Sequence, residues 1–288
     1  MADTGAAGGP RPAPDRDGID GSGTDRARCV LADNPGPMTL TGTNTWILAE
    51  PGASSALVVD PGPDDPAHLR RVLAALDARG LRPAAALLTH RHLDHSGGAR
   101  RFHELTGAPV RALDPHYRFG AEGLTDGDVI EADGLELRVV GAPGHTSDSL
   151  AFHLPADGAL LTGDTVLGRG TTVIAPDGGS LGDYLASMER LRALAASTGM
   201  RALLPGHGPL STAPLDLIDA YLRHRTERLA EIRAAIAAGA RTDEEVVAAV
   251  YHDVDDSVLT AALFSVRAQL DYLRERGEFP PRADAPAP

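Results

Sequence analysis

The sequence predicts an α+β protein in which two β-sheets lie between flanking helices, followed by a small helical C-terminal module. Three observations support this fold class. Short apolar or alternating segments bounded by turn residues predict strands, amphipathic helices flank these segments in both halves, and the strand pattern stops after Pro214.

The first half alternates strands and helices. Residues 45–49 and 56–60 read as strands separated by a turn-rich segment, and Pro66 opens a helix that ends before Gly80. A buried strand at 84–88 is followed by a polar segment at 89–98 and by a helix at 99–105. The polar segment therefore lies on the connection between a strand and a helix, where functional residues are common.

The middle of the chain is mainly β. Strands are expected at 110–113, 150–154, 159–161 and 201–204, and a hairpin at 128–140 turns at Asp133 and Gly134. Ser180 is placed to cap a helix before the last of these strands. Helices therefore flank strand-rich segments in both halves of the chain, as expected for two sheets packed between layers of helices.

After Pro214 only helices are expected. They cover residues 215–238, a segment opened by a capping box from Thr242 to Glu245, and residues 257–277. Both ends of the chain are rich in Gly, Pro and Ala, which predicts disorder. The predicted organisation is a disordered tail at 1–27, a main domain at 28–213, a helical module at 214–279 and a second tail at 280–288.

Composition narrows the class of protein. The net charge is −13, and all 27 basic residues are Arg, which disfavours a surface that coats nucleic acid. Cys29 is the only cysteine, so no intrachain disulfide can form, and we expect this residue to pack as a small apolar side chain. No apolar run is long enough to span a membrane, and the cytoplasm is the predicted compartment.

The segment at 89–98 carries three imidazoles and a carboxylate. His90 and His92 are two positions apart in an extended segment, so they face the same way and can hold one ion. Asp94 and His95 follow where the chain turns, so they can reach a second ion. Zinc accepts imidazole nitrogen and carboxylate oxygen without a thiolate. The alternative is a hydrated histidine-rich loop, which turn chemistry alone does not explain.

Three further strand ends carry residues that can bind metals. His145, Asp164 and His207 each lie beside a glycine directly after a predicted strand. Taken singly, each could be a structural polar residue. Together with the histidine-rich segment they predict one shared metal site.

These motifs resemble those of the metallo-β-lactamase superfamily, in order, over residues 40–209. The resemblance implies a four-layered αββα sandwich with two zinc ions at the sheet edges, although iron or manganese also suits such ligands. It assigns His90, His92 and His145 to the first ion, with Asp164 between the ions. The second ion would take Asp94, His95 and His207.

A narrower resemblance is to the β-lactamase-like protein 2 branch, carried by residues 34–46, 163–171 and 221–228, although that branch more often has Tyr at the position of Trp46. The branch has a winged-helix-like C-terminal module, which matches the helices after Pro214. Its eukaryotic members are single-strand RNA endonucleases, and related fungal members release acyl chains from carrier proteins. The resemblance therefore indicates the metal ligands and the type of reaction more closely than it indicates the substrate.

The predicted activity is hydrolysis by a hydroxide that bridges the two metal ions, with Asp94 orienting it as a catalytic residue. Single-stranded RNA is the first substrate considered, although the C-terminal module is acidic and only 42 residues separate Asp164 from His207. A thioesterase or ester hydrolase acting on acyl-carrier or glutathione thioesters is the alternative. A non-catalytic zinc-binding protein is the third, disfavoured because structural zinc sites are normally closed by four protein ligands.

Four residues around the Asp164 motif are expected to line the substrate groove: Arg169, Thr171, Thr172 and Tyr184. Tyr184 also fits a core position of the predicted helix, so both placements stay open for it. The sequence makes no prediction of the oligomeric state.

Overall fold

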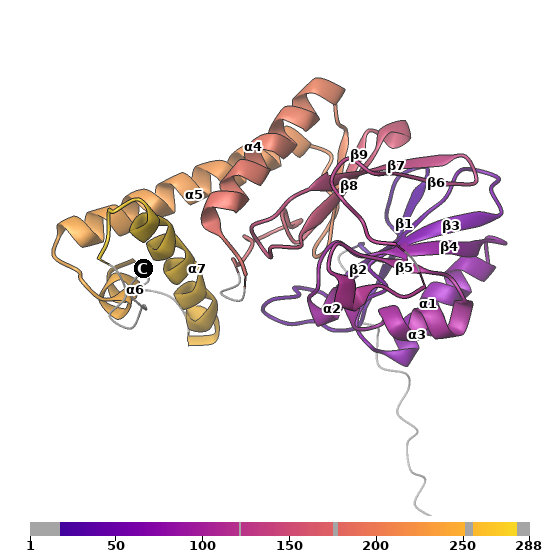
Figure 1. Ribbon diagram of the computed structural model, residues 1–288, viewed down its shortest axis with the longest axis horizontal. Helices are drawn as coiled ribbons and strands as arrows, with labels where there is room; N and C mark the ends of the chain where they lie inside the picture. Colours follow the sequence, from indigo (N-terminus) through magenta and orange to yellow (C-terminus); the bar gives the residue numbers. More distant parts are fainter. Residues whose placement is uncertain (1–17, 121, 175–177, 251–255, 281–288) are drawn as a thin grey trace, which may run out of the picture.

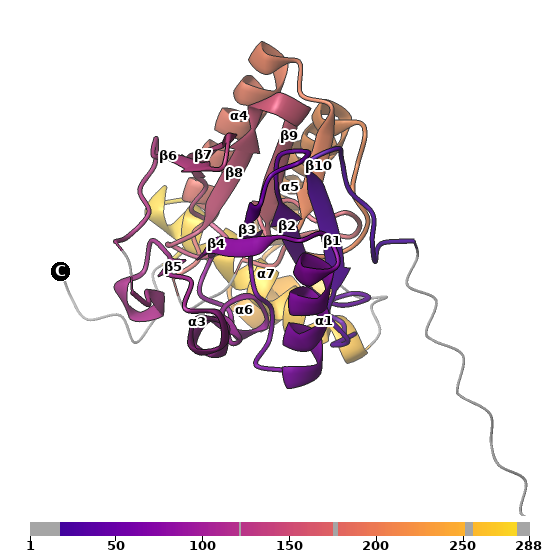
Figure 2. The ribbon, with the colours of Figure 1, turned by 90° about the vertical axis from the view of Figure 1, so that its right-hand side faces the viewer.

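The computed structural model describes residues 18–120, 122–174, 178–250 and 256–280. Two five-stranded sheets face each other, and helices cover their outer faces (Figure 1). The same layers are visible from the side (Figure 2). The predicted αββα sandwich with a helical C-terminal module is confirmed.

The first sheet has the order β1-β2-β3-β4-β5. The pairs β1/β2 and β2/β3 are antiparallel, whereas β3/β4 and β4/β5 are parallel. The strands are β1 (Ala27–Leu31), β2 (Asn44–Leu48), β3 (Ser55–Val59), β4 (Arg82–Leu87) and β5 (Val110–Arg111). Helices α1 (Pro66–Asp77) and α3 (Ala99–Thr106) connect the parallel strands and cover the outer face.

The second sheet has the order β10-β9-β8-β7-β6, and only β10/β9 is parallel. Its strands are β6 (Val129–Ala132), β7 (Leu135–Gly141), β8 (Leu150–Leu154), β9 (Ala159–Gly163) and β10 (Ala202–Pro205). Short 3₁₀ turns η1 (Pro115–Tyr117) and η2 (Pro155–Asp157) lie between strands. Helix α4 (Leu181–Thr198) covers the outer face, and the Ser180 side chain caps it by accepting from the backbone of Asp183.

The two-residue period of the strands produces the layers. On β3, Leu57 and Val59 join the core between the sheets, whereas Ala56 and Val58 pack toward α1 and α3. Strands β2, β8, β9 and β10 are buried along their whole length, whereas the edge strand β6 exposes alternate residues. The ends of the buried strands are therefore the places where polar residues can meet.

The C-terminal module consists of α5 (Pro214–Ala237), α6 (Asp243–Val250) and α7 (Asp256–Glu275). Helix α5 begins beside α4 and extends past the second sheet, and α6 and α7 lie at its far end (Figure 1). The predicted capping box is present, because Thr242 accepts from Glu245 N and the Glu245 carboxylate accepts from Thr242 N, both at 3.1 Å. Within described residues 214–250 and 256–280 the module contains helices and no strand.

The N-terminal boundary of the predicted domain is wrong. Residues 1–17 lie outside the described residues, but residues 18–27 are ordered and were predicted to be disordered. Ile19 is 2% exposed and belongs to the core between the sheets. Asp20 accepts from Leu31 N at 2.9 Å and ties this segment to β1. The Gly- and Asp-rich composition around Ile19 predicted disorder and gave no indication that this side chain is buried. Cys29 is buried, as expected.

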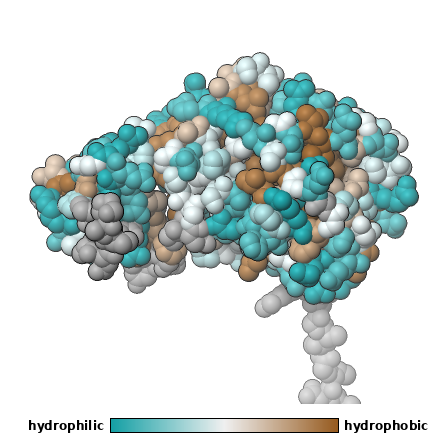
Figure 3. Space-filling model, viewed as in Figure 1, coloured by the Kyte–Doolittle hydropathy of each residue, from teal (hydrophilic) through white to brown (hydrophobic). Residues whose placement is uncertain are grey.

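The surface on the side shown in Figure 3 is largely hydrophilic, with scattered apolar residues. Among the helices in the described part of the chain, none combines the length and apolar composition needed to cross a bilayer. Of the C-terminal tail predicted at 280–288, residues 281–288 lie outside the described residues.

Candidate metal centre

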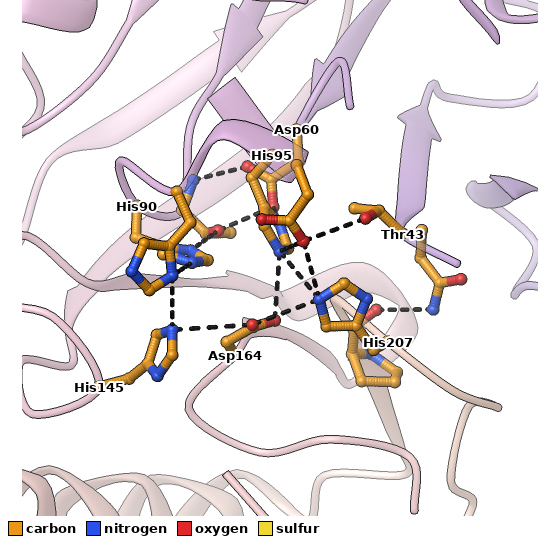
Figure 4. A network of polar contacts seen from close by, with 12 residues as sticks. Thr43, Asp60, His90, His95, His145, Asp164 and His207 are labelled. Atoms are coloured by element: carbon orange, nitrogen blue, oxygen red, sulfur yellow. Dashed lines mark hydrogen bonds and ion pairs between the residues drawn. The ribbon is translucent and has the colours of Figure 1, made fainter. Parts of the chain in front are cut away.

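The seven side chains predicted to bind metal lie at one edge of the sandwich, where strands from both sheets end. Figure 4 labels five of them: His90, His95, His145, Asp164 and His207. The first sheet contributes four of the seven directly after β4, two of which stand on the single turn α2 (Leu93–Ser96). The second sheet contributes the other three, each from a different strand end: His145 after β7, Asp164 after β9 and His207 after β10. The chain therefore brings together segments more than one hundred residues apart.

Three imidazoles form the first group. The Nε2 atoms of His90 and His145 lie 3.1 and 3.0 Å from His92 Nδ1. In the second group, Asp94 Oδ2 lies 3.3 Å from His95 Nε2 and 3.1 Å from His207 Nε2. Each group presents three ligand atoms to one point.

Asp164 lies between the two groups. Its Oδ1 atom is 3.3 Å from His95 Nε2, and its Oδ2 atom is 3.3 Å from His207 Nε2 and 3.7 Å from His145 Nε2. Asp164 Oδ1 is buried without a hydrogen-bond partner among the described residues. Burying a carboxylate oxygen in this way is costly unless a cation faces it, which can be a metal ion or the protonated ring of His95.

The spacing of the ligand atoms fits divalent cations. A tetrahedral ion with bonds of about 2.0–2.1 Å to nitrogen and oxygen holds its ligands roughly 3.3 Å apart. The separations within the two groups, 3.0 to 3.3 Å, match this value. The residues present therefore fit two divalent cations, with nitrogen and oxygen ligands and no thiolate.

The outer ring nitrogens are held by the protein. His90 Nδ1 donates to Thr89 Oγ1 at 2.9 Å, His145 Nδ1 to the Val173 carbonyl at 2.5 Å, and His207 Nδ1 to the Gly42 carbonyl at 3.0 Å. A donated hydrogen on the outer nitrogen leaves the lone pair of Nε2 facing the centre, as a metal ligand requires.

Asp60 supports the histidines of the centre by hydrogen bonds, although the sequence indicated it only as the end of a predicted strand. Its Oδ2 accepts from His95 Nδ1 at 2.8 Å and from Thr89 Oγ1 at 2.7 Å, while Oδ1 accepts from Thr89 N at 2.8 Å. Because Thr89 gives its hydroxyl hydrogen to Asp60, it accepts from His90. One buried carboxylate thus orients a histidine of each group. The motif had the same form as the others, an acid beside Pro and Gly after a buried strand.

The segment at 43–46 also supports the centre. Thr43 Oγ1 donates to Asp94 Oδ2 at 3.2 Å. Asn44 Nδ2 donates to the carbonyls of Pro205 and Gly208, both at 2.9 Å, so it holds the loop of His207 from both sides. In the sequence, Thr43 and Asn44 were recognisable only as part of the family resemblance at residues 34–46.

The electrostatics of the two groups differ. Burial lowers the pKa of His90 well below its usual value, which keeps it a neutral ligand. Burial also lowers the pKa of His95 and His207, but neighbouring carboxylates outweigh it. Asp94 is the main cause of the raised pKa of His95. Asp164 is the main cause at His207, whose pKa rises to about 9. A cation entering the second group therefore displaces protons, so its uptake depends on pH.

A close approach fixes the identity of one residue near the ligands. A Cβ atom on Gly206 would lie 2.5 Å from Asp164 Oδ1 and 2.7 Å from His95 Cε1. Only glycine lets the backbone before His207 pass the two ligands at this distance.

A cavity of about 130 Å³ opens beside His145 and Asp164. The predicted groove residues Arg169, Thr171 and Thr172 line this cavity, together with Pro37, Met38, Leu40 and Leu167. Thr172 is largely buried, and its Oγ1 donates to the Asp164 carbonyl at 2.8 Å.

The placement of Tyr184 in the groove is wrong. Tyr184 is fully buried in α4, and its hydroxyl donates to the Thr165 carbonyl at 2.8 Å. The helix periodicity that also placed this residue in the core is the pattern that the structure follows.

Two facing sheets enclosed by helices, with a His/Asp cluster at the strand ends, define a metal-dependent hydrolase of the αββα class. The chain belongs to the metallo-beta-lactamase superfamily, whose family model matches residues 38–207. Residues 242–278 match the beta-lactamase associated winged helix domain.

Two relatives cover most of the chain. A beta-lactamase-like protein 2 homolog from Caenorhabditis elegans is 31% identical over 262 residues, which is 88% of this chain and 86% of the relative. An atrochrysone carboxyl ACP thioesterase from Aspergillus fumigatus is 33% identical over 239 residues, 77% of this chain and 72% of the relative. Of these two relatives, only the second has a name that states a reaction.

Many solved structures are similar, among them the following two. A metallo-beta-lactamase family protein from Thermus thermophilus has a TM-score of 0.72 at 24% identity, with 87% of this chain and 94% of that one covered. The structure of TTHA1623 in a di-iron-bound form has a TM-score of 0.51 at 27% identity, with 65% and 96% covered. The first shares the fold, and the second shows iron bound in a similar protein.

Proposed function

We propose that this protein is a dinuclear zinc hydrolase that cleaves acyl thioesters or related esters. The observation that carries the substrate class is the cavity beside Asp164 and His145, which has an apolar wall next to the ligands. The similarity to a protein named as an acyl-carrier thioesterase supports the same class.

Two divalent cations held by the two ligand groups would lower the pKa of a shared water and polarise a carbonyl oxygen. Asp94 is the more exposed of the two carboxylates in the centre, with 26% of its side chain accessible against 11% for Asp164. Thr43 holds one oxygen of Asp94 in place. We infer that Asp94 accepts a hydrogen from the attacking water and so orients it, in addition to binding metal.

The apolar wall suits an acyl chain. Met38 is 51% exposed and lines the cavity together with Leu40 and Leu167. Exposed apolar side chains beside a reactive centre provide surface that an acyl group buries on binding. The apolar residues of this cavity offer no contact to the phosphates of a nucleotide backbone, although Arg169 lines the same cavity.

RNA cleavage is the alternative, and the winged-helix match is compatible with it. Phosphate binding depends on available cationic side chains. Two arginines of the C-terminal module pair with acids and are not available to phosphate: Arg233 pairs with Glu278 and Arg274 with Asp243, both at 2.6 Å. These pairs and the net charge of −13 disfavour a phosphate-binding face.

The identity of the metal belongs to this proposal. The donor set of nitrogen and oxygen suits zinc, and the di-iron form of TTHA1623 shows that iron is an alternative for a similar protein. The third alternative, a zinc protein without catalysis, does not account for a cavity that reaches the ligands.

The test offers zinc-replete protein three substrates side by side: medium-chain acyl-coenzyme A, an acyl-pantetheine thioester and labelled single-stranded RNA. We expect release of free thiol, loss of that activity with chelator and its return with zinc, while the RNA stays intact. The variant His90→Ala, assayed in parallel, controls for contaminating hydrolases. RNA cleavage without thiol release would replace the proposal by the nuclease, and no turnover of any substrate would favour the non-catalytic alternative.

A further inference from the structure

The loop that follows Asp164 is held by side chains of the C-terminal helix α5. The Tyr221 hydroxyl accepts from Leu167 N at 3.0 Å and donates to the Leu167 carbonyl at 3.3 Å. One helical turn later, the Arg225 guanidinium donates to the Thr172 carbonyl. Two residues on one face of α5 therefore fix two points of the loop.

Arg225 has an unusual environment for a charged group. It is 1% exposed, its guanidinium carbon lies 5.2 Å from the centre of the Tyr184 ring, and its NH1 atom is 3.5 Å from Ser265 Oγ of α7. Among the described residues it forms no ion pair with a carboxylate, and its Nε has no hydrogen-bond partner. Burying a guanidinium without a carboxylate partner costs free energy of folding. We therefore look for a role of Arg225 in the metal centre rather than in stability.

The segment that Arg225 holds also contacts two metal ligands. Thr172 Oγ1 donates to the carbonyl of Asp164 at 2.8 Å, and the next carbonyl, that of Val173, accepts from His145 Nδ1 at 2.5 Å. The Thr172 carbonyl between these two contacts is the acceptor for Arg225. Movement of this peptide would turn the His145 ring and shift the Asp164 backbone.

We propose that Arg225 is a positioning residue for the metal centre, through which the C-terminal helix sets the orientation of His145 and Asp164. The C-terminal module then contributes to metal binding without supplying a ligand. This inference depends on the metal centre and on no particular substrate, so it is tested by metal binding as well as by turnover.

The test compares Arg225→Met with Arg223→Met. Both residues lie on α5, but Arg223 is exposed, so its variant controls for the loss of a positive charge on this helix. The measurements are the stepwise affinity for zinc by chelator competition, the visible absorption of the cobalt(II)-substituted protein and the urea unfolding curve. Loss of a group that orients a ligand typically weakens metal binding or activity by roughly 10- to 100-fold. We expect a loss of this size in one of the two zinc affinities and an altered cobalt spectrum in Arg225→Met, with a cooperative unfolding transition retained.

The variant Arg225→Lys should recover part of the affinity, because an ammonium can still donate to the Thr172 carbonyl. If the protein hydrolyses thioesters, the variants should lower kcat by a larger factor than they raise KM. If Arg225→Met fails to fold, Arg225→Lys and Tyr221→Phe carry the comparison. Zinc affinities and cobalt spectra like those of the wild type in the folded variants would overturn the proposal, even where the variants are less stable.

Discussion

Replacing Asp60 by Asn tests how the protein holds its metal ligands. Asn keeps the size of the side chain, and it is well tolerated at the backbone φ of +53° that Asp60 adopts. The substitution puts an NH₂ group or a neutral oxygen where Oδ2 now accepts from His95 Nδ1 and Thr89 Oγ1. If NH₂ takes that place, His95 gains by moving its hydrogen to Nε2, which removes the lone pair that faces the centre.

The magnitude follows from the hydrogen bonds that the Asp60 carboxylate accepts. A hydrogen bond to a charged group contributes about 1.5–3 kcal/mol, and losing the partner of a metal-bound histidine costs roughly 10- to 100-fold in affinity. A 10- to 100-fold loss of affinity corresponds to about 1.4–2.7 kcal/mol, which agrees with the free energy of one such hydrogen bond. Because Asp60 orients His95 directly and His90 through Thr89, we expect both zinc affinities to fall.

The assay is competition for zinc with a chromophoric chelator, run on the wild type, Asp60→Asn and Asp64→Asn. Asp64 lies four residues away, is exposed and forms its ion pair with Arg101 on the surface, so its variant should bind zinc like the wild type. Unchanged zinc affinities in folded Asp60→Asn would refute the argument that this carboxylate orients both groups.

Three further predictions concern the ligands, the backbone and acid stability. His90→Ala should abolish turnover and leave the circular dichroism spectrum unchanged, and full activity in metal-replete variant would contradict the ligand assignment. Gly206→Ala should lower zinc content in elemental analysis, because its Cβ would lie 2.5 Å from Asp164 Oδ1; a full complement of zinc would show that the backbone gives way. Burial would raise the pKa of Asp157, but hydrogen bonds from Thr24 and Arg26 lower it below its usual value, so this stabilisation is present above about pH 4 and is lost as pH falls through the folded pKa. Asp157→Asn should therefore lower the free energy of unfolding by about 1–2 kcal/mol at pH 7 and by progressively less toward pH 2. Urea unfolding at several pH values measures this difference. A difference that does not change with pH would exclude the ionised carboxylate as its cause.

The elements were predictable where periodicity and turn chemistry agree. The Asp133–Gly134 hairpin, the Ser180 cap and the Thr242 capping box all appear as expected, because each depends on residues close together in the sequence. Ile19 was missed since its burial depends on a core that residues far along the chain create.

The ligands were predictable because each follows a strand end in the same local pattern, and the family resemblance grouped them. Their supporting residues were not. The role of Asp60 requires knowing that Thr89 and His95 lie against it, and the role of Arg225 requires knowing that α5 passes beside the Asp164 loop. Such contacts between distant segments leave no periodic pattern in a single sequence.

The central claim is that seven side chains from both sheets bind two cations. Anomalous diffraction at the zinc edge, from crystals of zinc-replete protein, tests it directly. The account predicts two peaks per chain, one among His90, His92 and His145 and one among Asp94, His95 and His207, with Asp164 between them. No peak at this edge of the sandwich, or a single peak held by other residues, would contradict it.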